Sequence, residues 1–202
     1  MEYKNTIKHI VKTEFDFGWK TQINPEIAEL AFKHAGESIL DVGCGTCQLY
    51  YYLRKRGWKG KYYGIDIRRY EGFKYPEDIV FILGDALEVE FPKVDTVILY
   101  NILEHVDDPI KLLSKAFRAA SKNVLINVPK RNEDLWRKGI VEWHQVDRDH
   151  RHNGFTVDEL QKVVELAGGK IIRLKEHWPI TAEIGINLWK SVIPKIIVRL
   201  LS

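Results

Sequence analysis

The 202-residue chain has few cysteines, little net charge and no long apolar run, and each of these absences excludes a class of protein. Two cysteines are too few for the disulfide framework of a small secreted domain. A net charge of +3 is too small to indicate a nucleic-acid-binding surface. Neither a signal-peptide pattern nor an apolar stretch of the roughly 20 residues that span a bilayer is present. We therefore expect a soluble, cytoplasmic protein with one full hydrophobic core.

Short β-rich runs alternate with helical patterns through most of the chain. The capping box of Thr156 and Glu159 starts the last helix, and Gly168-Gly169 ends it. The crossovers around the third strand are short, so helices there must be brief or absent. The alternation predicts an α/β fold with a doubly wound, mostly parallel Rossmann-like sheet in three α-β-α layers. Strands are predicted at 38–42, 61–65, 79–83, 96–100, 123–128 and 170–175, and helices at roughly 46–56, 108–121 and 156–167.

Both ends of the chain are expected to add helices to this core. At the amino end, Asn24 and Pro25 are helix-start signals. At the carboxyl end, the stretch 188–201 places apolar residues on one helical face and carries only basic charges. That stretch could pack on the domain, form a dimer contact or dock on a membrane surface, so monomer and homodimer both stay open. The single domain, 1–202, divides into a helical lead-in (1–37), a core (38–175) and a C-terminal amphipathic extension (176–202).

The stretch from Ile39 to Gln48 is the most informative part of the sequence. It is an apolar strand that ends in Asp41 and a glycine-rich turn and opens directly into a helix. Glycines let backbone N–H groups approach a ligand closely at a helix N-terminus. The turn also contains Cys44 and Cys47, spaced as in a dithiol redox site, but that interpretation leaves the acids further along without a role. A dinucleotide-binding loop would need a third glycine where Gln48 stands.

Polar residues follow four consecutive predicted strands at the point where each strand ends. Asp41 follows the first strand and Asp66 the second, and Asp85 and Asn101 follow the third and fourth. In a doubly wound sheet, ligands bind outside the carboxyl ends of the strands. An acid after the second strand can accept both hydroxyl groups of a ribose. The pattern therefore predicts a nucleoside-binding site at this edge of the sheet.

These motifs resemble those of the class I S-adenosylmethionine-dependent methyltransferases. The resemblance covers about residues 38–175 and rests on Leu40–Thr46, Gly64–Asp66, Gly84–Ala86 and Leu103–Val106. It implies S-adenosyl-L-methionine as the cofactor. The cofactor-binding residues that it implies are Asp41, Gly43, Cys44, Gly45, Thr46, Cys47, Asp66, Ile67, Asp85, Ala86 and Asn101.

The resemblance also implies a role for each part of this set. The segment from Asp41 to Cys47 would wrap the methionine moiety and the ribose, and Asp66 would hold the ribose hydroxyls. Asp85 with Ala86 would meet the adenine, and Asn101 would line the methionine end. The family usually has a third glycine where this chain has Cys47, which affects how closely the start of the helix approaches the cofactor.

Candidates for acting on the methyl acceptor come from the segment after the fourth strand and from 143–152. Glu104 and His105 are the catalytic candidates, with His105 either a general base or a structural residue at a helix start. The segment 143–152 holds three histidines and either binds the acceptor or forms a salt-bridged surface loop. The amino end supplies Trp19, as a lid over the site or as a core residue. The substrate candidates are thus Trp19, His144, His150 and His152.

The sequence predicts no metal site. Glu104 and His105, with a distant histidine, resemble the metal ligands of the RNA 3′-terminal 2′-O-methyltransferases. That pattern has a further glutamate where this chain has Asn101.

The predicted function is in-line transfer of a methyl group from S-adenosylmethionine to a small-molecule acceptor. Two alternatives remain, an RNA methyltransferase and a catalytically silent partner subunit that binds the cofactor. The charge balance gives little support to nucleic acid as a partner. The sequence does not distinguish O-, N-, S- and C-methylation.

Overall fold

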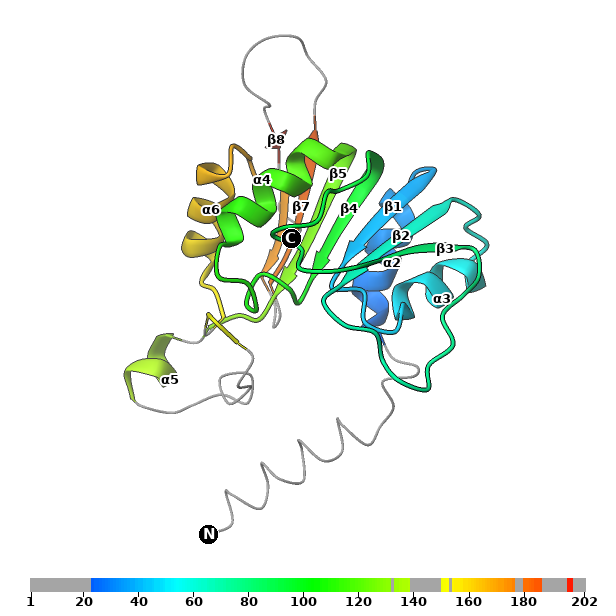
Figure 1. Cartoon of the computed structure of the whole chain (residues 1–202). Helices are drawn as coiled ribbons and strands as arrows, with labels where there is room; N and C mark the ends of the chain where they lie inside the picture. Colours follow the sequence, from blue (N-terminus) through cyan, green and yellow to red (C-terminus); the bar gives the residue numbers. More distant parts are fainter. Residues whose placement is uncertain are drawn as a thin grey trace.

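The computed structural model describes residues 23–131, 133–138, 150–152, 154–176, 180–186 and 196–197 (Figure 1). Among the helices that it describes, none has both the length and the apolar character needed to cross a membrane. The elements in chain order are α2 (Pro25–His34), β1 (Ser38–Val42), α3 (Gln48–Lys55), β2 (Lys61–Asp66), β3 (Ile79–Leu83), β4 (Val94–Tyr100), α4 (Pro109–Ala119), β5 (Ala120–Val128), α5 (Glu133–Arg137), α6 (Val157–Leu166), β6 (Arg173–Glu176), β7 (Ile180–Ile186) and β8 (Ile196–Ile197).

The strands form one sheet in the order β3-β2-β1-β4-β5-β7-β6, with β8 paired to β7. The five strands from β1 to β5 run parallel, whereas β7 is antiparallel to each of its neighbours. The strand order reverses between β1 and β4, because the chain moves outward to β3 and then returns to the other side of β1. This doubly wound arrangement confirms the predicted fold class.

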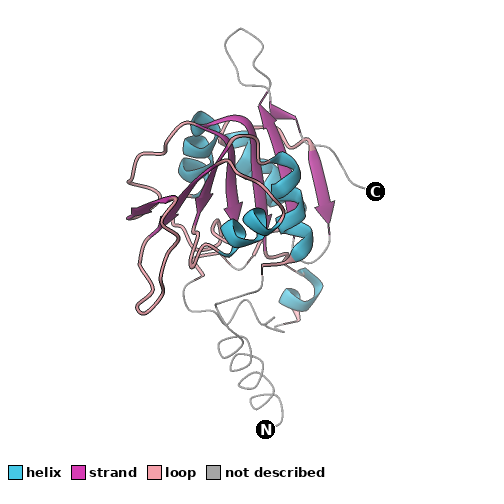
Figure 2. Cartoon of the chain, turned by 90° about the vertical axis from the view of Figure 1, so that its right-hand side faces the viewer, coloured by secondary structure: helices cyan, strands magenta, loops and turns pink. Residues whose placement is uncertain are grey.

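Helices cover both faces of the sheet (Figures 1 and 2). Neighbouring residues of the central strands pack in different hydrophobic cores. Leu40 and Val97 pack in the cluster that includes residues of α4 and α6. Ile39 and Ile98, each next to one of them, pack in the cluster that includes residues of α2 and α3. All four side chains are buried. The central strands are therefore apolar on both sides, as a parallel sheet between two helical layers requires.

Local signals set the helix boundaries largely as the sequence predicts. The Asn24 side chain accepts a hydrogen bond from the backbone N–H of Glu26 at 2.9 Å, and Pro25 occupies the first turn. Thr156 and Glu159 form the predicted reciprocal capping box of α6. In the described chain, no helix connects β2 to β3 or β3 to β4, which confirms the expectation for the short crossovers.

The C-terminal helical addition is a wrong prediction for the residues that are described there. The residues 180–186 form β7, antiparallel to β5, and Ile196–Ile197 form β8 against the end of β7. The edge of β5 offers unpaired backbone groups, and an isoleucine-rich segment suits a strand that fills such an edge. Tertiary pairing thus prevails over the helical spacing. The rest of 188–201, with the dimer and membrane contacts considered for it, and residues 1–22 lie outside the described residues.

Candidate active site

An open pocket of about 340 Å³ lies at the carboxyl ends of β1 and β4, where the strand order reverses. Ligands of doubly wound sheets bind at this place, and the volume is within the range of small-molecule sites. Six of the predicted cofactor-binding residues line it: Asp41, Gly43, Cys44, Gly45, Thr46 and Asn101.

The glycine turn after β1 is fastened to the end of β2. The backbone N–H groups of Gly43 and Cys44 both donate to the Ile65 carbonyl, at 2.8 and 3.0 Å. Gly43 has a φ of +76°, and a Cβ placed there would lie 3.0 Å from the end of the Ile102 side chain. Gly45 has a φ of +52° and open space where a Cβ would stand. Both glycines are therefore needed for their backbone conformation, and Gly43 also for close packing.

Asp66 is the last residue of β2, and its side chain supports the same glycine turn. Its carboxylate accepts from the Gly45 N–H at 2.8 Å and from the Arg68 N–H at 3.1 Å. The following residue, Ile67, is 71% exposed, which is unusual for a large apolar side chain. Asp66 and Ile67 lie beside the pocket lining rather than in it. Because β1 and β2 are parallel neighbours, their carboxyl ends face the same side of the molecule.

Asp85 and Ala86 follow β3 at the same edge. The Asp85 carboxylate accepts from the Leu87 N–H at 2.8 Å, which closes a tight turn after the strand. Asp85 is exposed, whereas Ala86 is buried. Neither residue is in the pocket lining.

Asp41 is a buried carboxyl group in the pocket lining. Only 5% of it is exposed, and the hydroxyl of the buried Tyr62 donates to its carboxylate. Burial raises the pKa of Asp41 to about 7, the Tyr62 hydrogen bond opposes the rise, and the charge of Asp66 adds to it. At neutral pH the carboxyl group is therefore poised between its two protonation states. A cationic ligand group beside it would favour the ionised form.

The two cysteines have no sign of redox function. Both are free and buried. The hydrogen bond to Cys47, with burial, raises the pKa of the Cys44 thiol, so the reactive thiolate is disfavoured. Cys47 caps α3 with a left-handed φ of +58°, so the helix starts at Gln48 rather than at 46. The Cys47 side chain lies in the core, and Cys47 is not in the pocket lining.

The segment after β4 contributes Asn101 to the pocket lining and carries the two catalytic candidates, Glu104 and His105, which are not in that lining. Asn101 has a left-handed φ of +50°, and its N–H donates to the Asn127 carbonyl on β5 at 2.8 Å. A tight turn follows, in which the His105 N–H donates to the Ile102 carbonyl at 3.0 Å. Glu104 is 1% exposed, whereas His105 is half-buried. A strained backbone conformation at a pocket is typical of a functional position.

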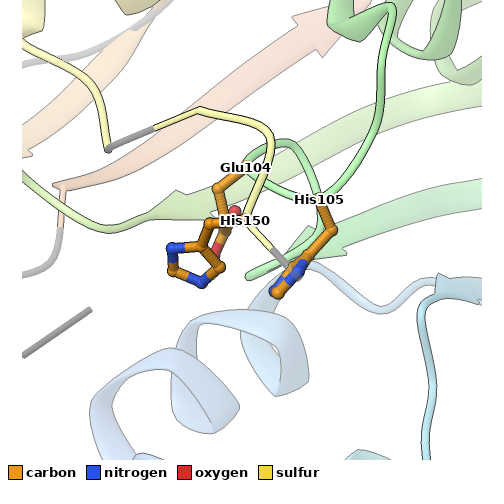
Figure 3. Close-up of side chains that lie close together, drawn as sticks. All are labelled: Glu104, His105 and His150. Atoms are coloured by element: carbon orange, nitrogen blue, oxygen red, sulfur yellow. The ribbon is translucent and has the colours of Figure 1, made fainter. Parts of the chain in front are cut away.

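His150 joins Glu104 and His105, as Figure 3 shows. One nitrogen or oxygen atom of each side chain lies within 4.8 Å of the other two. His152 lies close by, but its Nε2 is 3.1 Å from the Val106 carbonyl, at hydrogen-bond distance from the backbone. Of the four substrate candidates, Trp19 and His144 lie outside the described residues.

Residues 18–174 match the family model of a methyltransferase domain. The chain belongs to this methyltransferase family. Membership, with the fold, confirms three predictions from the sequence: the class I S-adenosylmethionine-dependent family, methyltransferase activity and S-adenosyl-L-methionine as the cofactor.

A curated relative is the tRNA U34 carboxymethyltransferase of Sulfurovum sp. (strain NBC37-1), which is 32% identical to this chain over 117 residues. The match takes in 53% of this chain and only 38% of that protein. Two solved structures share the fold. Magnesium protoporphyrin IX methyltransferase of Synechocystis PCC 6803, with bound SAH, has a TM-score of 0.60 at 16% identity, covering 91% of this chain and 99% of its own. Human N-acetylserotonin methyltransferase, in complex with SAM, has a TM-score of 0.60 at 17% identity, covering 77% and 50%.

Several residues of the methyltransferase pocket were not found from the sequence. The Tyr75 hydroxyl, from the loop between β2 and β3, donates to the Gly45 carbonyl at 3.2 Å. Nothing in the local sequence indicates this contact or the bond between Tyr62 and Asp41. The helix-start signal at Asn24 was visible, but its place beside the pocket depends on how α2 packs. The lining residues missed are Ile23, Asn24, Ile27, Gln48, Leu49 and Tyr100.

Proposed function

We propose that this methyltransferase transfers the methyl group of S-adenosylmethionine to a small molecule by in-line displacement. One observation carries the proposal: the pocket between the ends of β1 and β4 has the glycine turn on one side and Asn101 on the other. Glu104 and His105 follow Asn101 in the same loop. A cofactor held by the glycine turn would therefore present its methyl group toward the β4 side.

The proposed cofactor contacts follow the order of the strands. The glycine turn and Asp41 take the methionine moiety, where the positive charges of the amino group and the sulfonium favour an ionised Asp41. Asp66 takes the ribose hydroxyls. Asp85 and Ala86 take the adenine, with the exposed side chain of Ile67 as an apolar cover for the ring. Such a cover would explain why a large apolar residue is left in solvent without ligand.

In this reaction, the protein itself forms no covalent bond to the cofactor or the acceptor. A lone pair of the acceptor forms a bond to the methyl carbon as the carbon–sulfur bond breaks, and sulfur keeps the electron pair. Positioning and exclusion of water supply most of the catalysis. We place Glu104 and His105 on the acceptor side, where either side chain can accept the proton that a hydroxyl acceptor loses.

The choice of a small molecule rests on two observations. Both structural neighbours described above are named for small-molecule acceptors. The net charge of +3 also provides little electrostatic attraction for a polyanion. The second candidate is an RNA acceptor, which the relative named for tRNA favours. The cytoplasmic location and a monomeric or dimeric state stay predictions.

The cofactor contacts are tested by calorimetric titration of the full chain with S-adenosylhomocysteine. Asp66→Ala is expected to weaken binding by roughly 30-fold or more, since it removes a charged acceptor of two hydroxyl groups and loosens the glycine turn. The matched control is Asp78→Ala, another aspartate, whose carboxylate bonds Tyr50 and Arg54. Equal affinity of wild type and Asp66→Ala would contradict the site.

The acceptor class is tested by methyl-label transfer from S-adenosylmethionine to a panel of phenols, alcohols, amines, lipids and tRNA. Label on a small molecule supports the proposal. Label on tRNA alone contradicts the proposal and supports the RNA alternative.

A further inference from the structure

Glu104, His105 and His150 form a compact cluster that is outside the pocket lining and that the cofactor contacts do not use (Figure 3). One ligand-capable atom of each side chain lies within 4.8 Å of the other two, and the imidazole rings meet edge-to-face with their centroids 4.5 Å apart. We propose that these three side chains bind a divalent transition-metal ion of the zinc type.

The distances suit such an ion. Zinc binds nitrogen and oxygen at about 2.0–2.2 Å, so ligand atoms around a tetrahedral ion are about 3.4 Å apart. Side-chain rotations that shorten the present separations, which are at most 4.8 Å, by up to about 1.4 Å would complete the coordination. His105 and His150 are half-buried, which leaves room for rotamer changes on their exposed side.

The type of ligand selects the type of ion. Two imidazole nitrogens and one carboxylate oxygen favour zinc and its neighbours over magnesium or calcium, which prefer oxygen ligands throughout. Three protein ligands also leave a coordination position open, as in catalytic rather than structural zinc sites. The sequence predicts no metal because Asn101 replaces a glutamate, but three ligands are enough for a site of this class.

The backbone holds the three ligands in place although one of them is remote in the sequence. The N–H groups of Arg151 and His152 both donate to the Glu104 carbonyl, at 2.7 and 3.0 Å. The His152 ring adds the contact with the Val106 carbonyl, and both Leu103 and Val106 are buried. The segment that carries His150 is therefore fixed to the turn that carries the other two ligands, as a preformed site requires.

The position of the cluster indicates what the ion would do, and this step rests on the proposed function. Glu104 lies three residues beyond Asn101, which lines the pocket, and we place the open coordination position on the acceptor side. A zinc-bound hydroxyl loses its proton far more readily than a free one. The proton passes to bulk water, the oxygen bonds the methyl carbon and the sulfur leaves with the electron pair of the carbon–sulfur bond. The acceptor is then an alcohol or a phenol, and His105 acts as a ligand rather than a base.

Cobalt titration of the full, chelator-treated chain tests the site. Co²⁺ in a zinc site gives visible absorption bands, and we expect saturation at one equivalent and displacement by Zn²⁺. Glu104→Gln, His105→Gln and His150→Gln are each expected to weaken Co²⁺ binding at least about tenfold. His152→Gln is the matched control, since it removes a histidine of the same segment whose ring lies against the backbone. It is expected to keep the cobalt spectrum.

Titration with S-adenosylhomocysteine on the same samples separates the two proposals. Cofactor binding without stoichiometric Co²⁺ or Zn²⁺ binding overturns the metal site and leaves the proposed function standing. Metal binding without cofactor binding overturns the proposed function and leaves the metal site standing. Equal loss of cobalt in all four variants, with cofactor binding retained, also overturns the assignment of these ligands.

Discussion

The loop after β1 and the loop after β4 face the same pocket but are held in different ways. The β1 loop is fixed by nearby parts of the chain, through two N–H donors to the Ile65 carbonyl and through Asp66. The β4 loop is likewise bonded to the next strand, through the Asn101 N–H and β5, but it is also fixed by a remote segment, because the Glu104 carbonyl accepts from the backbone of residues 151 and 152. The first loop has Gly43 and Gly45 at positive φ, followed by Cys47 where α3 begins, whereas the second loop has no glycine and places Asn101 at positive φ.

This difference separates the two halves of the reaction. A cofactor-binding loop built from one local motif needs little beyond its own sequence and the next strand. An acceptor-binding loop that depends on a segment far along the chain can change with that segment while the cofactor site is kept. We therefore expect substitutions after β1 to act on cofactor affinity and substitutions after β4 to act on the acceptor half.

Among substitutions within the two loops, the largest effect on cofactor binding is expected from Gly43→Ala. The alanine must adopt a φ of +76°, and its Cβ would lie 3.0 Å from the Ile102 side chain. Left-handed backbone costs an ordinary residue about 1–2 kcal/mol, so with the displaced Ile102 we expect roughly 30-fold weaker binding of S-adenosylhomocysteine by calorimetry.

Gly57→Ala is the control for this prediction. It has a φ of +89° with open space around a Cβ, and it lies at the other end of α3. The substitution should lower the free energy of unfolding by about 1 kcal/mol and leave the dissociation constant unchanged. Equal loss of affinity in both variants would show that backbone strain acts through global stability, and the local account of the loop would be wrong.

An intermediate effect is expected from the protonation of Asp41. Its pKa of about 7 means that the folded protein without ligand holds this proton below neutral pH. The cationic methionine end of S-adenosylmethionine favours the ionised form, so affinity should rise roughly tenfold from pH 6 to pH 8. Asp41→Asn should bind with nearly constant affinity over the same range. A pH-dependent wild type with an equally dependent variant would assign the titration to another group.

The raised pKa of Asp41 also predicts how the stability of the ligand-free protein depends on pH. The pKa of Asp41 is raised from its usual value of 3.8, so its contribution is present below about pH 4 and is lost as the pH rises through 7. Thermal unfolding of Asp41→Asn should therefore show a smaller loss of stability between pH 5 and pH 8 than wild type. The reverse order would contradict the raised pKa.

The contrast between the loops also explains what could be predicted from the sequence. The strands from β1 to β5 and the residues of the glycine turn were found because their signals are local, a hydrophobic run followed by glycine or an acid. The strand β7 was missed because an edge of β5, not its own pattern, makes it a strand. The Tyr75 contact was missed, and His150 was not distinguished from His144 and His152 as the partner of Glu104 and His105, for the same physical reason, since each contact joins segments that only the folded chain brings together.

Asn101 allows backbone strain and side-chain contact to be separated in the second loop. Asn101→Gly relieves the φ of +50° but removes the amide, whereas Asn101→Ala removes the amide and keeps the strain. Both should weaken S-adenosylmethionine binding about fivefold, the worth of a lost hydrogen bond. Only the alanine variant should lose stability, by about 1 kcal/mol in urea unfolding. Wild-type affinity in the glycine variant would remove Asn101 from the site.

The smallest effect is expected from Tyr75→Phe, which tests whether the first loop needs support from outside its own motif. The variant loses the hydroxyl that donates to the Gly45 carbonyl at 3.2 Å and keeps the ring packed against Phe73 and Phe81. A partly exposed bond of this length contributes about 0.5 kcal/mol, so S-adenosylhomocysteine binding should weaken about twofold. Tyr52→Phe, whose hydroxyl bonds Glu29, is the matched control and should bind as wild type does. A loss of tenfold or more would mean that the β2–β3 loop, and not only the glycine motif, shapes the cofactor site.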